Sequence, residues 1–192
     1  CGLSRDASKE EILERINNNT ITDILNKIEV KAGDVVMVKA GTIHAIGAGV
    51  FICEIQQNSN CTYRMYDYDR RDKFGNPREL HVKKALDVVD NHKYIKDNKT
   101  EVVIARNEHF TEERLVQCKY FEVYKYDVND EAKITVDEAS FVSVLFINGS
   151  GTIETDDYEK TMEFKAGDSF FVSAGLRSII IKGQATMVVT RV

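Results

Sequence analysis

The spacing of apolar residues changes from helical to strand-like near residue 29. Before that point apolar side chains recur three or four positions apart, and Ser8 followed by Glu11 fits a helix-capping box. The asparagine run at 17–19 interrupts this pattern. We therefore expect residues 1–28 to form a helical lead-in segment made of two short helices.

Beyond the lead-in, short apolar or alternating runs are separated by glycine turns. The run GVFICEIQQ, for example, places alternate side chains on opposite faces of a strand. Similar runs fill most of residues 29–75 and 101–192, as in a sandwich or barrel of short strands. The exception is a helix predicted over residues 77–90, with Asn76 as its cap and Pro77 in its first turn.

An internal repeat connects the two halves of the strand-rich region. Residues 29–46 read EVKAGDVVMVKAGTIHAI and residues 163–180 read EFKAGDSFFVSAGLRSII, and the two align without a gap. Both contain a Gly-Asp turn, an apolar strand, a second glycine turn and another strand. The repeat predicts two related β-modules.

His44 is the candidate metal ligand of the first copy, and Ser178 occupies its place in the second. A zinc site needs about three or four ligands, and a single histidine beside apolar residues is more often a packed or surface side chain. The other histidines, His81, His92 and His109, share no short strand or turn with His44. Spacing alone does not assemble a metal site.

Composition narrows the class of protein. The hydrophobic share of 43% and charged share of 30% are typical of a globular chain. A net charge of −5 and a pI near 5.5 argue against general nucleic-acid binding. There is neither an apolar run long enough to cross a membrane nor a signal-peptide pattern. The four cysteines lack C-x-x-C spacing, which favours reduced thiols and a cytoplasmic location.

The stretch AGTIHAIGAGVFICEIQQNSNCTYRMYDYDRRDKFGNPREL resembles the type I mannose-6-phosphate isomerases, bacterial short form, in their carboxy-terminal part. The resemblance rests on His44, on EIQQNS at 54–59, on YRMYDYDR at 63–70 and on RELH at 78–81. It implies a mainly β fold with two cupin-like double-stranded β-helix modules.

These modules would follow the helical segment of residues 1–28. The first, residues 29–100, would be incomplete and would contain the inserted helix. The second, residues 101–192, would lack the metal histidine.

The resemblance also implies roles for individual residues. His44 would bind Zn²⁺, and Arg64 would be the active-site arginine that also binds substrate. Glu54 would be a catalytic carboxylate lining the same cavity. Tyr66 shares a strand face with Arg64 and is a substrate-binding candidate, although an ordinary packed strand gives the same pattern. A metal that polarises oxygens, a forked guanidinium and a nearby carboxylate suit proton transfer between C1 and C2 of a sugar phosphate.

The resemblance places the remaining zinc ligands upstream of this sequence, so we expect an incomplete zinc site in a truncated fragment. The predicted activity is the zinc-dependent interconversion of mannose 6-phosphate and fructose 6-phosphate, with a small-molecule sugar phosphate as the partner. The alternative is a non-catalytic cupin-type module that binds carbohydrate or regulates another protein. A third hypothesis is another sugar-phosphate isomerase or epimerase on the same fold.

Overall fold

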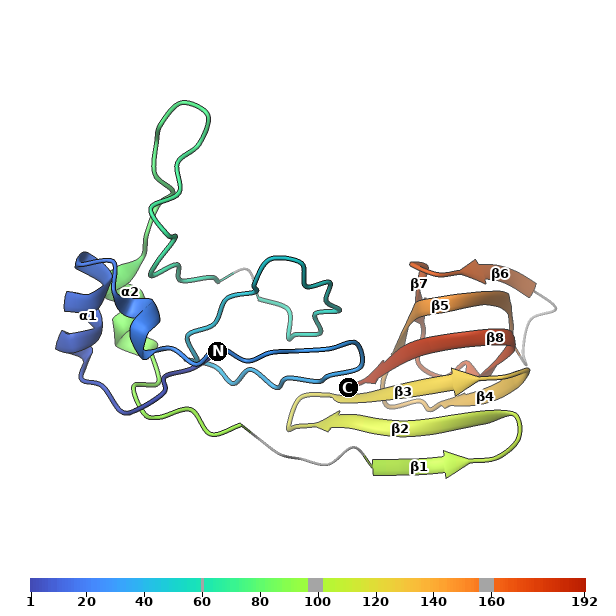
Figure 1. The fold of residues 1–192 in the computed structure, drawn as a ribbon. Coiled ribbons are helices and arrows are strands. Elements are labelled where there is room, and N and C mark those ends of the chain that lie inside the picture. Colours follow the sequence, from blue (N-terminus) through green and yellow to red (C-terminus); the bar gives the residue numbers. More distant parts are fainter. Residues whose placement is uncertain (60, 97–101, 156–160) are drawn as a thin grey trace. The chain divides into compact units, whose positions relative to one another are not determined.

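The computed structural model describes residues 1–59, 61–96, 102–155 and 161–192, and its chain divides into two units, Cys1–Asp97 and Asn98–Val192 (Figure 1). In the described residues every helix belongs to the first unit and every strand to the second. None of these helices has the length and apolar character needed to cross a membrane.

Helix α1 of the first unit, Lys9–Asn17, begins where the sequence predicts it. The Ser8 hydroxyl accepts a hydrogen bond from the Glu11 backbone amide at 3.1 Å, which confirms the predicted cap. Instead of reaching back to Ser8, the Glu11 carboxylate binds Arg5 and Arg15. The second predicted helix is a single 3-10 turn, η1, Ile21–Ile24.

The hydrophobic core of the first unit gathers short segments from both of its ends. Helix α2, Val82–Val88, contributes Ala85, and Leu3 is hydrogen-bonded through its carbonyl to the Tyr94 amide at 2.8 Å. The buried members of this core are Leu3, Ala7, Ile12, Ile16, Ile21, Ile24, Met65, Ala85 and Val89. The lead-in segment is therefore packed into a small core of its own.

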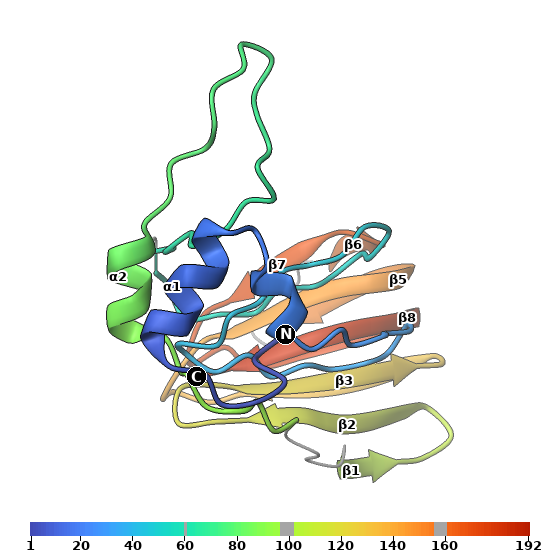
Figure 2. The same cartoon turned by 60° about the vertical axis from the view of Figure 1, so that its left-hand side comes forward.

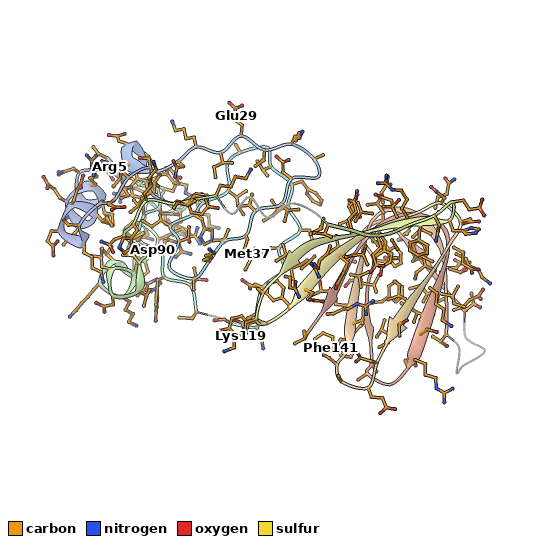
Figure 3. The ribbon with its side chains drawn as sticks, turned by 90° about the horizontal axis from the view of Figure 1, so that it is seen from below. Arg5, Glu29, Met37, Asp90, Lys119 and Phe141 are labelled. Carbon is orange, nitrogen blue, oxygen red and sulfur yellow. The ribbon has the colours of Figure 1, made fainter. Side chains whose placement is uncertain are left out.

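The residues between η1 and α2 contain no strand in the part of the chain that the structure describes. They run as coil, on which Glu29 and Met37 lie (Figure 3), with isolated bridges such as that between Arg71 and Pro77. The strands predicted over residues 29–75 are wrong for the described residues. Alternation places side chains on two faces, but a strand also needs a hydrogen-bonded neighbour. The architecture with two β-helix modules is therefore not confirmed.

The predicted helix of residues 77–90 is shorter than expected. Helix α2 begins only after His81, which makes no side-chain capping bond. The Asn76 backbone amide instead donates to the Asp72 carboxylate at 2.9 Å, and Pro77 takes part in a bridge. The cap and first-turn signals belong to a tight turn, whose chemistry uses the same residue types.

The second unit is a sheet structure whose described strands follow the order β1-β2-β3-β8-β5-β6 (Figure 2). Strand β4 pairs with β8, and β7 pairs with β5. All pairings are antiparallel. In chain order the strands are β1 Val102–Arg106, β2 Phe110–Gln117, β3 Glu122–Val128, β4 Glu131–Val136, β5 Val142–Thr155, β6 Thr161–Lys165, β7 Ser169–Val172 and β8 Arg177–Arg191. The mainly β prediction is confirmed for this unit.

Strands β5 and β8 are long enough to belong to two layers. The first part of β5 pairs with β7 and its second part with β6, while the two parts of β8 pair with β4 and then β3. Both strands change layers at glycines. A Cβ on Gly149 (φ +91°) would lie 1.9 Å from the Gln184 carbonyl oxygen, and one on Gly183 would lie 2.5 Å from that of Ser150. Only glycine permits so close an approach of the two backbones.

The core of the second unit is filled by alternate residues of these strands. Phe146, Ile134, Ile181 and Met187 are fully buried, and the Phe146 ring stacks on that of Phe164 with centroids 3.7 Å apart. The alternating burial of β4 is typical of a strand with one face on a core and the other exposed.

The turns of the internal repeat have the same geometry in both copies. Gly33 and Gly167 have φ angles of +93° and +92°. In each copy the aspartate after the glycine accepts a hydrogen bond from a lysine backbone amide three residues earlier, at 3.0 Å for Asp34 and 2.9 Å for Asp168. The repeat therefore specifies the same local turn whether or not strands form around it.

Candidate functional site

His44 lies on a segment anchored to both ends of the first unit. The Gly41 carbonyl accepts from the Asp90 amide at 2.9 Å, and the Ile43 carbonyl accepts from the Gly2 amide at 2.7 Å. The ring of His44 is exposed, and its Nδ1 lies 2.9 Å from the Thr42 carbonyl oxygen. A carbonyl oxygen only accepts, so Nδ1 carries a proton, and in the neutral ring the lone pair is on Nε2.

The tautomer of His44 fits one ligand of a zinc ion, because metal-binding histidines commonly donate their other N–H to a carbonyl. The described residues do not supply the remaining ligands. Among the described residues no group of three or more His, Cys, Asp or Glu side chains is arranged to hold a metal. A structural or catalytic zinc needs at least three protein ligands. The described residues therefore supply a fitting ligand but do not form a complete site.

Arg64 is held by three hydrogen bonds to the segment that leads into α2. Its backbone amide donates to His81 Nδ1 at 3.2 Å, and the His81 amide donates to the Arg64 carbonyl at 2.6 Å. The guanidinium Nη1 donates to the Glu79 carbonyl at 3.2 Å. Since His81 Nδ1 accepts, the proton of the neutral ring is on Nε2. The predicted catalytic arginine is thus fixed in place at backbone and side chain.

The other two predicted residues are placed differently. Glu54 is exposed on the coil, and Tyr66 is half-buried against the core of the first unit with its ring 4.9 Å from that of Tyr68. The strand on which Tyr66 would share a face with Arg64 does not form in the described residues. Over the described ranges no hydrogen bond, ion pair or ring contact joins His44, Glu54 and Arg64, so a shared cavity for the three stays a prediction.

Asp67 is a buried charged residue that the sequence did not single out. Its side chain is 7% exposed, and its Oδ1 accepts from Arg70 Nη2 and lies 3.5 Å from Arg78 Nη1. Oδ2 is buried and has no hydrogen-bond partner in the described part of the chain. The spacing of three residues between Asp67 and Arg70 was a signal for the first pair, but nothing in the sequence marks Arg78.

A tight turn ends the arginine-rich segment. The Asp72 carboxylate accepts from the Phe74 amide at 2.8 Å and from the Asn76 amide at 2.9 Å. The Asn76 amide, followed by the Phe74 amide, lowers the pKa of Asp72, because both favour the ionised carboxylate. Residues 72–76 therefore form an ordered turn, and just before it Arg71 pairs with Asp69 at 3.1 Å.

The fold of the second unit defines a class of protein. Two layers of antiparallel strands that share two long strands are the jelly-roll arrangement of cupins. A family model described as the cupin domain of mannose-6-phosphate isomerase matches residues 111–192.

Three relatives extend this finding to the first unit. The putative mannose-6-phosphate isomerase YvyI of Bacillus subtilis is 41% identical over 190 residues, which cover 96% of this chain and 57% of the relative. The mannose-6-phosphate isomerase ManA of Bacillus subtilis is 33% identical over 95% of this chain and 56% of its own length. The crystal structure of the mannose 6-phosphate isomerase from Bacillus subtilis matches with a TM-score of 0.87 and 37% identity, over 100% of this chain and 59% of that one.

Residues 111–192 thus match the cupin domain of mannose-6-phosphate isomerases, and nearly the whole chain is similar to proteins of that name. The chain spans less than two thirds of the length of each of these relatives.

Proposed function

We propose that this chain is part of a cytoplasmic enzyme that interconverts mannose 6-phosphate and fructose 6-phosphate with the help of zinc. The observation that carries the proposal is the fixed position of Arg64, whose backbone and guanidinium are both hydrogen-bonded to residues 79–81. The names of the relatives support the same reaction. Since the relatives are longer, the proposal concerns the protein of which this chain forms a part.

The reaction moves a proton between adjacent carbons of the open-chain sugar. A base takes the proton from C2 of mannose 6-phosphate, and an enediol forms as the C1 carbonyl oxygen gains a proton. A proton then returns to C1 while the C2 hydroxyl loses its proton, which leaves the C2 carbonyl of the ketose. A guanidinium next to the enediol oxygens would stabilise the negative charge that develops there, and we assign this role to Arg64. Glu54 is an exposed carboxylate that we assign to the proton transfer.

Zinc would polarise the same oxygens when bound. We propose His44 as one of its ligands, through Nε2, because Nδ1 faces the Thr42 carbonyl. The other ligands would have to come from outside the described residues. Zinc analysis of the longer protein and of its His44→Ala variant tests this: the variant should lose most of its zinc, and an unchanged content would refute the assignment.

The catalytic assignment is tested by a coupled assay on mannose 6-phosphate in the longer protein. Arg64→Ala should lower kcat about 10²- to 10³-fold, as expected for a group that stabilises developing negative charge. Arg71→Ala is the matched control, because Arg71 is an exposed arginine of the nearby turn that pairs with Asp69. Equal activity of Arg64→Ala and the wild type would refute the role of Arg64.

A second candidate function is carbohydrate binding without catalysis. It is favoured by one observation, that the described residues gather no set of three metal ligands. The two candidates differ in the assay: a binding module would bind mannose 6-phosphate without converting it. A panel of other aldose phosphates in the same assay separates a related isomerase or epimerase from both.

A further inference from the structure

Charged and phenolic side chains lie on the core-facing side of β2, β3 and β8 in the second unit. Arg114 pairs across the strands with Tyr124, which pairs with Val189, a fully buried core residue. Glu112 pairs with Tyr126, which is only 2% exposed. Since cross-strand partners share a face, one polar set lies on the inner side of this sheet: Glu112, Arg114, Glu122, Tyr124, Tyr126 and Arg191.

The two carboxylates of this inner polar set are bound by uncharged donors. The Tyr126 hydroxyl donates to Glu112 Oε1 at 2.6 Å, and the Tyr124 hydroxyl donates to Glu122 Oε2 at 2.6 Å. The Gln117 amide donates to the second oxygen of Glu122. Burial, and then Glu112, raises the pKa of Tyr126, so its hydroxyl stays a donor at neutral pH.

The two guanidinium groups of the set are left without a carboxylate. Arg191 pairs in register with Glu122, yet neither Arg191 nor Arg114 forms an ion pair with any described residue. The Arg191 guanidinium instead lies 5.5 Å from the centre of the Tyr124 ring and approaches the neutral Tyr126 phenol. Its Nε is buried with no hydrogen-bond partner in the described residues.

These hydrogen bonds differ from those expected if the two arginines only neutralised the glutamates. Such arginines bind the carboxylates directly, often through two parallel hydrogen bonds. Here register places Arg191 opposite Glu122, but phenol and amide groups occupy the carboxylate oxygens. A buried donor without a partner costs free energy. The buried Nε of Arg191 and the charge of Arg114 therefore lack a partner among the described residues.

We propose that the inner polar set of the second unit is a binding site for a phosphorylated sugar. The forked guanidinium groups of Arg114 and Arg191 match the oxygens of a phosphate. A bare anion would also meet two carboxylates on the same face. The ligand must therefore carry, besides its charge, a hydroxyl donor for the Glu112 oxygen that Tyr126 does not bind. The ring of Tyr124 offers an apolar surface to the sugar carbons.

This site goes beyond the proposed activity. The residues assigned to that activity, His44, Glu54 and Arg64, all belong to the first unit, and the inner polar set belongs entirely to the second. The inference therefore stands or falls independently of the isomerase proposal.

Isothermal titration calorimetry on the 192-residue chain tests the site. All proteins carry Arg64→Ala, so that binding at the proposed catalytic arginine does not contribute. The ligands are mannose 6-phosphate, inorganic phosphate and mannose. Arg114→Gln and Arg191→Gln remove one charge each, and Arg106→Gln removes an exposed charge of β1 that lies near Glu113 instead. Far-UV circular dichroism confirms that each variant keeps its strands.

Mannose 6-phosphate should bind more tightly than inorganic phosphate, and mannose should bind most weakly. Arg114→Gln and Arg191→Gln should each weaken mannose 6-phosphate about 10- to 100-fold, the loss of one charged hydrogen-bonding partner, and Arg106→Gln should leave it unchanged. The proposal is overturned if mannose 6-phosphate does not bind, or if it binds equally well to folded Arg114→Gln. Should Arg191→Gln lose its strands, Arg114→Gln decides the outcome.

Discussion

Replacing Gly149 by alanine tests the point where β5 passes from one layer of the second unit to the other. The alanine would keep φ near +91°, which costs an L-residue roughly 1–2 kcal/mol. Its Cβ would also lie 1.9 Å from the Gln184 carbonyl oxygen and 2.8 Å from Ala185 Cα, so the two backbones must separate. Overpacking of this kind costs about 1–3 kcal/mol, so that the total loss is about 2–5 kcal/mol.

Gly167→Ala is a matched control that measures only the cost of a positive φ angle, which is called the backbone term below. Its φ of +92° is nearly that of Gly149, but a Cβ there would have no heavy atom within 4 Å. Urea unfolding followed by far-UV circular dichroism reports on the second unit, since all described strands belong to it. Gly149→Ala should lower the free energy of unfolding by the backbone term plus the steric term, and Gly167→Ala by the backbone term alone. Equal losses would show that the layers are not in close contact at Gly149.

Three further predictions follow from the packing and the charges. Phe146→Ala should lower the free energy of unfolding by about 3–5 kcal/mol in the same urea assay, because the ring is fully buried. The hydrogen bond to Asp130 raises the pKa of His109. The His109–Asp130 pair should therefore stabilise the fold fully below about pH 6.5, and this contribution should disappear as the pH rises through the raised pKa. In urea unfolding between pH 5 and pH 9, His109→Asn should lack this pH dependence. Hydrogen bonding to Arg5 lowers the pKa of Glu11 to about 2. The wild type should therefore lose helix, measured by circular dichroism, as the pH falls from about 4.5 to 2, and Glu11→Gln should not show this change.

The fold was predictable where local signals and strand partners lie in the same unit. The Ser8 cap is a local signal, and α1 begins as expected. The alternating runs of residues 101–192 form strands because each finds a neighbour within that unit. The helix at residues 77–90 was predicted too long, since Asn76 and Pro77 serve a turn as readily as a helix start.

For the candidate site, the sequence named individual residues but not their arrangement. The sequence predicted that Arg64 and Tyr66 share one face of a strand, but the described residues form no strand there. The sequence could not show that Glu79 and His81 hold Arg64 in place, because they follow it by 15 and 17 positions. Nor could it find the buried carboxylate of Asp67 between two arginines, since burial depends on how the coil folds back on itself.

The two copies of the internal repeat share a local turn but differ in whether a strand follows it. Gly33 and Gly167 adopt the same left-handed φ, and the aspartates that follow them make the same hydrogen bond to a lysine amide. The residues after Gly167 nevertheless form β7, paired with β5, whereas the residues after Gly33 form no strand. Both stretches carry the same pattern, so the difference comes from the presence of a neighbouring strand and not from propensity. Amide hydrogen exchange of residues 34–40 tests this explanation. If these amides exchange more slowly in the longer protein than in this chain, they have gained strand hydrogen bonds, and the partner strand lies outside the residues described here.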